Sequence, residues 1–429
     1  MQMIPKFGVL CEGVQSCYLQ TEKFRTNLFS VSFLLPKTLD RLAAQSLLTG
    51  LLTDTCDKYP NLTAINRRLA MLYGAHVSGT VSDLGDMHAL RFFVSCLNDS
   101  FSLDGESITL SCVQLLCEML FHPYLPNGNF WDADFQTEKR QLLEDVQAQI
   151  NDKIRYAQAR ARQFMFDGTP FGLPEAGGEE NVLALKSEAA LLEWQQMLHM
   201  APIIVSYIGP NDAQEIFSLF SQELTAIGRK AQEAPSSLLF PLSDRPIRAV
   251  TETMDLVQAK LVLGLRTATT ARDELYYPMR MALDIFGGGV YSLLFTKVRE
   301  QMGLCYYCSA RPNNFVGAAF VNSGIEASDF EKARDAIMQQ LGDIQKGEFD
   351  DSLMEVSKLS FQNMMKTLYD SPSSLDAWFF LRMVDGSMTA IDEFCENICK
   401  VTAQEVVQAA ERIKLDTVYL LTGKDGDTL

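Results

Sequence analysis

The chain has 429 residues, with 37 lysines and arginines against 54 aspartates and glutamates, so its formal net charge is −17. Apolar residues make up 47% and aromatic residues 10%, which is enough to build the cores of two or three domains. An acidic surface of this kind repels phosphate backbones and anionic lipid headgroups. We therefore expect no nucleic acid and no membrane among the partners of this protein.

The N-terminal segment does not have the pattern of a secretory signal, because no basic segment is followed by an apolar core. The apolar runs, such as Leu28–Pro36, are far shorter than the roughly 20 residues that cross a bilayer. We expect a soluble, cytoplasmic chain. Its ten cysteines are too few for a disulfide scaffold, and we expect them to be reduced.

The predicted elements repeat along the chain. The first half contains a strand, a helix, a second helix that ends at a glycine, and a hairpin turn; these lie at 28–36, 39–56, Gly74 and 82–86. A shift of 229 residues brings them close to the matching pattern of the second half, at 257–265, 268–285, Gly303 and 311–314. Each half then ends in a helix and a strand, at 187–200 and 203–209, and at 403–413 and 417–423.

This order predicts an α+β fold of two tandem homologous domains, each a largely antiparallel sheet covered by helices on one face. We expect an N-terminal domain over 1–232 and a C-terminal domain over 248–429. The segment 233–247 between them is rich in serine, proline and charged residues, as an exposed linker is.

Histidines are few, and they limit the metal chemistry. The sequence has four of them, and no two lie one helical turn apart beside a glutamate, as a hydrolytic zinc site requires. His76 and His88 fall on either side of the first hairpin turn, and they remain a minor alternative as a non-standard metal site together with Asp86. The main expectation is no metal and no cofactor.

Two further groups of residues lie near Gly303. Cys305 and Cys308 are spaced as C-x-x-C, but residues three apart on a strand point to opposite faces, which argues against a redox or metal role. Arg299 is predicted at the end of a helix, and Tyr306 on the strand that follows. Both side chains are hydrogen-bond donors that could bind one carbonyl oxygen.

The segment from Phe286 to Tyr306 contains Gly-Gly-Gly, Ser292-Leu-Leu-Phe and Arg-Glu-x-x-Gly-Leu-x-Tyr. It resembles the C-terminal-domain motif of the insulinase/pitrilysin zinc metallopeptidases, a family that includes the mitochondrial processing peptidase. Two further segments resemble the helix with the third zinc ligand and the loop after it, at 138–146 and 170–177. The resemblance covers nearly the whole chain and implies the same tandem α+β fold.

The chain departs from the family at its catalytic motif. Active members carry H-x-x-E-H on the first long helix, and counting back from Gly74 places the three functional positions at Leu48, Leu51 and Leu52. Glu144 would be the remnant of the third-ligand helix, without companions. The resemblance therefore implies a zinc-less bacterial member that does not cleave peptides alone.

In two-chain members of the family, one subunit carries zinc and the other retains the arginine and tyrosine that reach the substrate backbone. By this resemblance, Arg299 and Tyr306 would bind peptide, and the partner would be a zinc-containing paralogue or a second copy of the chain. The alternative that stays open is a structural or peptide-binding homodimer without a role in proteolysis.

Overall fold

The computed structural model of the chain describes residues 4–230 and 246–423. Most of the predicted linker, 233–247, lies outside the described residues, apart from its last two. The described residues form two compact units, and neither is continuous in sequence. Unit 1 contains residues 4–147, 173–230 and 368–384, and unit 2 contains residues 148–172, 246–367 and 385–423.

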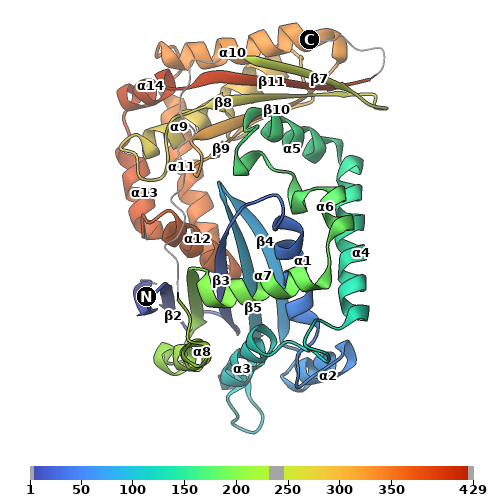
Figure 1. The fold of residues 1–429 in the computed structure, drawn as a ribbon. Coiled ribbons are helices and arrows are strands. Elements are labelled where there is room, and N and C mark those ends of the chain that lie inside the picture. The colour runs from blue at the N-terminus through green and yellow to red at the C-terminus, as the bar shows by residue number, and fades with distance from the viewer. Residues whose placement is uncertain (1–3, 231–245, 424–429) are drawn as a thin grey trace. The chain divides into compact units, whose positions relative to one another are not determined.

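In its described residues, unit 1 contains six strands and eight α-helices, which follow one another along the chain in short groups (Figure 1). They are β1 Lys6–Cys11, β2 Val14–Gln20, β3 Thr26–Pro36, α1 Leu42–Asp54, α2 Leu62–Met71, β4 His76–Leu84, β5 Met87–Leu97, α3 Ile108–Phe121, α4 Asp132–Ala148, α6 Glu179–Ala184, α7 Ser187–Met200, β6 Ile203–Gly209, α8 Ala213–Ile227 and α12 Pro372–Val384.

Unit 2 has a similar order. Its elements are α5 Lys153–Met165, β7 Arg248–Thr253, β8 Ala259–Arg266, α9 Tyr276–Gly287, the π-helical turn η5 Leu294–Gln301, β9 Tyr307–Asn313, β10 Ala318–Ile325, α10 Phe330–Gln345, α11 Ser352–Leu368, α13 Ile391–Lys400, α14 Ala403–Glu411 and β11 Lys414–Thr422.

Each unit is built around one mixed sheet. The strand order is β1-β2-β6-β3-β5-β4 in unit 1 and β7-β11-β8-β10-β9 in unit 2. All neighbouring strands are antiparallel except β2 with β6 and β7 with β11. The predicted α+β fold, with two largely antiparallel sheets covered by helices, is confirmed.

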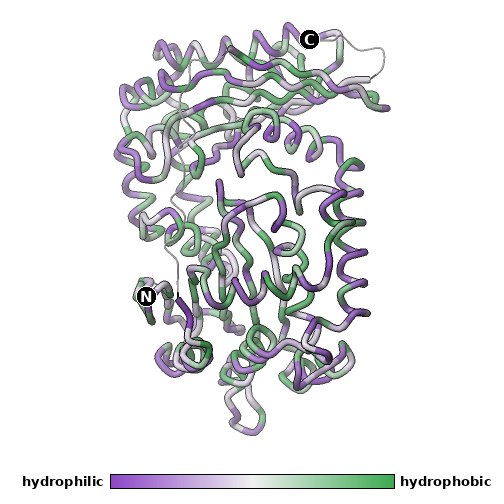
Figure 2. The backbone as a smooth tube through the Cα atoms, in the orientation of Figure 1, coloured by the Kyte–Doolittle hydropathy of each residue, from purple (hydrophilic) through white to green (hydrophobic). Residues whose placement is uncertain are grey.

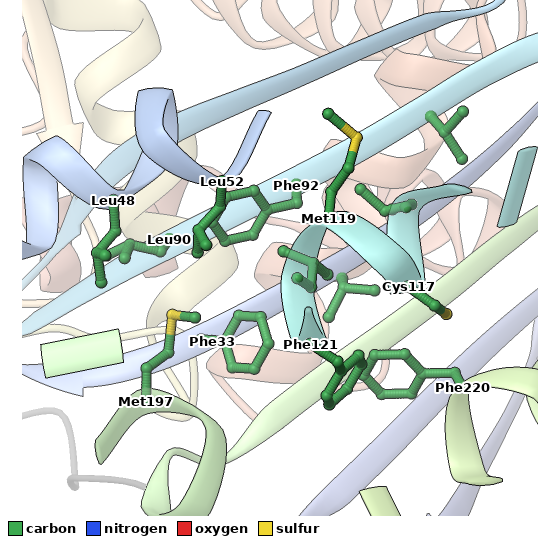
Figure 3. Close-up of a cluster of buried hydrophobic side chains, with 14 of the residues drawn as sticks. Phe33, Leu48, Leu52, Leu90, Phe92, Cys117, Met119, Phe121, Met197 and Phe220 are labelled. Carbon is green, nitrogen blue, oxygen red and sulfur yellow. The ribbon is translucent and has the colours of Figure 1, made fainter. Parts of the chain in front are cut away.

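The main core of unit 1 lies between its sheet and helices α1, α3, α7 and α8. Apolar side chains alternate along β3 into this core, with Phe29, Val31 and Phe33 fully buried in it. The close-up in Figure 3 shows Phe33 among side chains of α1, β5 and α3. Hydrophilic and hydrophobic residues alternate along α4 in Figure 2, as expected of a helix with one buried face.

The prediction that helices cover one face of each sheet is incomplete for unit 1, because α12 packs on its second face against β3 and β6. Asp376 of this helix is buried and accepts hydrogen bonds from Ser30 Oγ and from Arg91 Nη2, both at 2.7 Å. The guanidinium of Arg91 also lies 3.8 Å from the centre of the Phe380 ring. The paired charges explain how a buried carboxylate can lie between helix and sheet.

In unit 2, the equivalent second-face helix is α5. Ala157 and Ala161 lie one helical turn apart and pack against Val262 and Tyr419 of the sheet. Alternate residues of β8, such as Leu263, turn to the opposite face and are also buried. Thus each sheet is completed by one helix from the other half of the sequence. Among the described residues of either unit, no helix has the length and apolarity needed to cross a bilayer.

Candidate functional site

The inner face of α1 is apolar. Leu48, Leu51 and Leu52, the positions assigned to the lost zinc motif, all belong to the core of unit 1, and Leu48 and Leu52 have no exposed surface. Figure 3 shows both leucines beside Leu90 and Phe92 of β5. A hydrated metal ion could not lie on this face of the helix, because a catalytic site needs an open position for water.

The outer face of α1 carries a different set of residues. The positions of the helix that are not fully buried recur with helical spacing, at Ser46, Thr49, Gly50, Thr53 and Asp54. Ser46, Thr49 and Gly50 have the i, i+3, i+4 spacing of H-x-x-E-H, two residues before the assigned positions. The assignment to the leucines stays a prediction, but in both registers the motif residues are absent.

Glu138 of α4 lies directly against this outer face. A methyl group on Gly50 would collide with the Glu138 carboxyl group, so the glycine is what lets that carboxyl group approach α1. Asp54, one helical turn further along α1, forms a hydrogen bond with Glu138. Asp134 lies nearby and accepts a hydrogen bond from Thr55 Oγ1 at 3.3 Å.

These three carboxyl groups disfavour one another's ionisation. Burial, followed by the charge of Asp54 and the hydrogen bond to it, raises the pKa of Glu138 to about 7. Burial also raises the pKa of Asp54, although the bond from Glu138 opposes that rise, and burial raises the pKa of Asp134. Glu138 is therefore the partner that holds the shared proton near neutral pH.

Glu144, the residue assigned to the third-ligand helix, does not face α1. Its side chain is exposed and pairs with Arg140 on the same helix at 3.1 Å. The sequence comparison included Glu138 at the start of the matching segment but did not select it. The signal that could have distinguished the two is their difference of six residues, which places them on different sides of a helix.

The histidines do not form a metal site. The register of β4 with β5 pairs His88 with Asp83 but pairs His76 with Ser95, seven positions away along the ladder. The minor alternative of a metal site formed by His76 and His88 with Asp86 is therefore wrong, since the two histidines lie about 23 Å apart along the strands. His88 is buried and bonded to Gln45 at 2.8 Å, and burial lowers its pKa to about 4.

The donor set also fails to fit the zinc that the family resemblance implies. Within residues 4–230 and 246–423, no three His, Cys, Asp or Glu side chains are grouped to hold a metal ion. The residues that the structure places next to Glu138 are Gly50 and Asp54, and neither supplies an imidazole. We therefore derive no metal-dependent step for this chain.

Arg299 and Tyr306 lie in unit 2, on either side of Gly303. Arg299 is on the last turn of η5, where its guanidinium lies 4.5 Å from the centre of the Phe295 ring and its Nε lies 3.5 Å from Glu300. Tyr306 precedes β9, is 57% exposed, and donates its hydroxyl hydrogen to Glu326. Tyr306 is exposed and Arg299 is half-buried, and the structure shows no direct contact between their side chains.

Cys305 and Cys308 differ from the sequence expectation. Cys305 precedes β9, so the two cysteines do not lie on one regular strand. The chain bends at Tyr306, whose N–H donates to Gly324 O at 2.9 Å. Gly324 is also the ladder partner of Tyr307, so two successive residues oppose one, as in a β-bulge. The bulge interrupts the strand alternation on which the expectation of opposite faces rested.

Unit 1 also contains a polar cavity of about 280 Å³. Its lining includes Lys58 and Arg68 as well as Glu118 and Glu223, so both signs of charge are present. None of the residues that the sequence motifs single out lines it.

The comparisons with known proteins agree with this fold. The sequence model described as the peptidase M16 inactive domain matches residues 194–360. The "Probable inactive metalloprotease YmfF" of Bacillus subtilis is 28% identical over 418 residues, which cover 96% of this chain and 97% of that protein.

Solved structures extend the likeness to the whole chain. A conserved protein from Enterococcus faecalis superposes with a TM-score of 0.90 at 25% identity, with 99% of each chain covered. A peptidase M16 inactive domain from Pseudomonas fluorescens superposes with a TM-score of 0.78 at 14% identity, over 99% of this chain and all of that one (100%). The resemblance predicted from the motifs is confirmed: this chain is a homologue of the M16 peptidases, the insulinase-type family, and is similar to proteins and domains of that family described as inactive.

Proposed function

We propose that the protein is a non-catalytic M16 homologue that binds an extended peptide through Arg299 and Tyr306 and assists cleavage by a zinc-containing paralogue. The observation that carries this proposal is the exposed hydroxyl group of Tyr306 and the half-buried guanidinium of Arg299 near an edge strand, in a chain whose α1 has no zinc-motif residue in either register.

The donors are available for a ligand. Within the part of unit 2 that the structure describes, Arg299 makes one ion pair, a long one with its neighbour Glu300. Most of its N–H groups are therefore free to bind a carbonyl oxygen or a carboxylate. Tyr306 needs only to exchange Glu326 for a ligand to donate its hydroxyl hydrogen.

The neighbouring backbone suits an extended ligand. β9 is the last strand of its sheet and has one ladder partner, β10, among the residues that the structure describes. The outer edge of such a strand presents N–H and C=O groups that a peptide can bind by adding a strand. Tyr306 lies immediately before the first residue of this strand, and Arg299 lies on η5, the helical turn that precedes it in the chain.

The test is to reconstitute the protein with the zinc-containing paralogue of the same genome and measure peptide cleavage. Arg299→Ala should reduce kcat/KM by about tenfold or more, because it removes a charged donor to the substrate backbone. The matched control is Arg334→Ala. Arg334 also lies over a phenylalanine four residues earlier, Phe330, and pairs with the acid that follows it, Asp335.

Equal loss in both arginine variants, or no loss in either, would contradict the assigned role of Arg299. A tight complex whose cleavage rate does not depend on this chain would favour the alternative, a structural homologue without a role in proteolysis. A direct readout on the chain alone is peptide binding by fluorescence anisotropy, which Tyr306→Phe should weaken about tenfold if the hydroxyl donates to the peptide.

A further inference from the structure

The polar cavity of about 280 Å³ in unit 1 is built by three parts of the chain. Helix α3 contributes Ser111, Gln114 and Glu118, whose spacing of three and four residues places them on one face of the helix. Helix α8, which packs against α3, contributes Leu219 and Glu223, again one helical turn apart. The third part is the end of α2 with the loop before it. In the view of Figure 1, α3 lies between α8 and α2.

The charges around the cavity are separated by sign. Lys58 and Arg68 belong to the α2 side, whereas Glu223 belongs to α8 and Glu118 to α3. A ligand with a charge of one sign would be attracted to one side of the cavity and repelled by the other. A ligand with a negative group at one end and a positive group at the other would be attracted at both ends.

The two cations lack protein partners. Within residues 4–230 and 246–423, the guanidinium of Arg68 forms no hydrogen bond or ion pair, although its Nε is buried. The ammonium group of Lys58 lies 5.8 Å from the centre of the Tyr59 ring and likewise forms no ion pair in this part of the chain. A buried donor without a partner costs free energy, which a ligand carboxylate would recover.

The two carboxylates are also available. Glu223 Oε2 lies 3.2 Å from His122 Nε2, and its other oxygen has no partner among the described residues. The carboxylate of Glu118 forms neither a hydrogen bond nor an ion pair within the same ranges. The α3 and α8 sides of the cavity therefore offer acceptors to an ammonium group.

The loop on the cation side is held in place by backbone hydrogen bonds. Cys56 and Tyr59 exchange N–H···O bonds of 3.1 and 3.0 Å around Asp57 and Lys58, and the Asp57 N–H donates to His122 O at 2.9 Å. The backbone that carries Lys58 is therefore fixed relative to the end of α3 before a ligand binds. Such pre-organisation reduces the entropy that binding costs.

We propose that this cavity binds a dipeptide with apolar side chains, whose carboxylate contacts Lys58 and Arg68 and whose ammonium group contacts Glu118 and Glu223. This site is separate from the peptide site proposed in unit 2 and does not rest on it.

Size and lining favour a dipeptide over other zwitterions. The volume is just below the range of about 300 to 1,000 Å³ that is usual for small-molecule sites, so the ligand is limited to a few residues. A dipeptide carries its charges at opposite ends of a chain of about 7 Å, whereas a single amino acid carries both on one carbon atom. Leu115, Leu219 and the ring of Tyr59 supply apolar surface for the side chains.

The test is isothermal titration calorimetry of the full chain with the dipeptide leucyl-leucine. We expect one dipeptide to bind per chain. N-acetyl-leucyl-leucine lacks the ammonium group and leucyl-leucine amide lacks the carboxylate, so each should bind at least about tenfold more weakly. Free leucine should bind at least about tenfold more weakly as well, because it cannot place its two charges on opposite sides of the cavity.

Variants on the two sides separate charge recognition from a change in the fold. Arg68→Gln should weaken leucyl-leucine about tenfold and leave binding of the amide unchanged, because the amide has no carboxylate for the guanidinium. The matched control is Arg67→Gln, its exposed neighbour on α2 outside the cavity, which should change neither. Glu223→Gln should weaken leucyl-leucine and the amide but not the N-acetyl derivative. Its control is Glu215→Gln, an exposed glutamate of the same helix.

Absence of binding at millimolar leucyl-leucine would overturn the proposal, and so would equal affinity for a blocked derivative or for free leucine. Binding of inorganic phosphate as tight as that of the dipeptide would indicate a simple anion site instead. Arg68→Gln that weakens all four ligands alike would mean a structural role for the arginine and would also overturn the proposal.

The two sites of the chain can be told apart. Loss of leucyl-leucine binding in Arg299→Ala, with full binding in Arg68→Gln, would place the dipeptide in unit 2 and overturn the proposal for this cavity. No readout here measures cleavage by a paralogue, so failure of the proposed function would leave the dipeptide site as it stands.

Discussion

Units 1 and 2 use the same position in their repeats for different polar contacts. In each unit a long helix follows a central strand, α1 after β3 and α9 after β8, and its last turns carry an aspartate. In unit 1 Asp54 meets the carboxyl group of Glu138, whereas in unit 2 Asp284 accepts hydrogen bonds from the hydroxyl groups of Ser357 and Tyr291.

The two aspartates differ in the groups that surround their carboxylates. Burial raises the pKa of Asp284, but the two hydroxyl groups and the charges of Arg280 and Arg311 oppose that rise. The charges that shift the pKa values of Asp54 and Glu138 are all negative, so Glu138 keeps its proton up to a pH of about 7. Unit 1 therefore depends on a proton at a place where unit 2 depends on ordinary hydrogen bonds.

The largest expected effect concerns what the two helices share, their buried apolar faces. Leu52→Ala in α1 and Leu283→Ala in α9 should each lower the free energy of unfolding by about 2 to 5 kcal/mol, because both leucines are fully enclosed. Urea unfolding measures the loss. Thr53→Ala, on the outer face of α1, is the control and should cost about 0.5 kcal/mol or less. A large loss of unfolding free energy in one unit alone would contradict the view that both helices are held by equivalent apolar faces.

Next in size is the loss of a hydroxyl donor in unit 2. Ser357→Ala should lower the free energy of unfolding by about 1.5 to 3 kcal/mol at pH 7, because it removes a buried hydrogen bond to a charged group. The loss should become smaller as the pH falls, because Asp284, whose pKa is raised by burial, becomes protonated at a higher pH than an ordinary aspartate. Thr367→Ala, an exposed hydroxyl on the same helix, should change little. A loss that is independent of pH would contradict the assigned contact.

The proton shared by Glu138 and Asp54 in unit 1 leads to a smaller change, and here the substitution should raise the free energy of unfolding. The pKa of Glu138 is raised to about 7 in the folded state and is about 4.3 when unfolded, so its contribution to stability is complete below about 4.3 and is lost as pH rises through 7. Glu138→Gln should remove this loss, since an amide can donate to Asp54 without ionising. We expect the free energy of unfolding of the variant to be higher by about 1 kcal/mol at pH 8 and unchanged at pH 4. The value at pH 8 is small because the Glu138 carboxyl group is partly exposed to solvent.

Glu144→Gln is the matched control, because Glu144 lies on the same helix and is exposed. It should follow the wild-type pH profile. Identical profiles for Glu138→Gln and the wild-type protein would mean that the carboxyl pair does not share a proton.

Local sequence patterns were sufficient for the repeat and for most elements. The expected strand 203–209 and helix 187–200 coincide with β6 and α7, and both hairpins exist, as β4–β5 and β9–β10. The chain turns later than expected, because residues 82–84 still belong to β4 and residues 311–313 to β9. These elements are specified by apolar periodicity and by stop signals within the same segment. The exchange of α5 and α12 between the two sheets has no such signal, because an amphipathic helix does not specify which sheet it covers.

The site was less accessible to sequence reasoning. The motif singles out Arg299 and Tyr306, and their role stays a prediction, whereas the choice between Glu138 and Glu144 depends on which side of α4 meets α1. The relation between Cys305 and Cys308 depends on a bulge of one residue, which strand alternation alone does not reveal. Each of these features arises from how two elements meet.

The smallest expected effect tests that α1–α4 contact most directly. Gly50→Ala places a methyl group against the Glu138 carboxyl group, the far end of a flexible side chain that can rotate toward solvent. The replacement also favours the helix by about 0.8 to 1 kcal/mol, so the net change in unfolding free energy should stay within about 1 kcal/mol. Because the carboxyl pair separates, the loss of stability between pH 5 and 8 should disappear as it does in Glu138→Gln.

Gly79→Ala is the control for simple crowding, since its methyl group would lie 2.5 Å from the backbone oxygen of Thr49, which cannot rotate away. It should cost about 1 to 3 kcal/mol at every pH. If Gly50→Ala lowered the free energy of unfolding as much as Gly79→Ala does, the Glu138 carboxyl group would be fixed in place. The proton shared with Asp54 would then not explain the difference between α1 in unit 1 and α9 in unit 2.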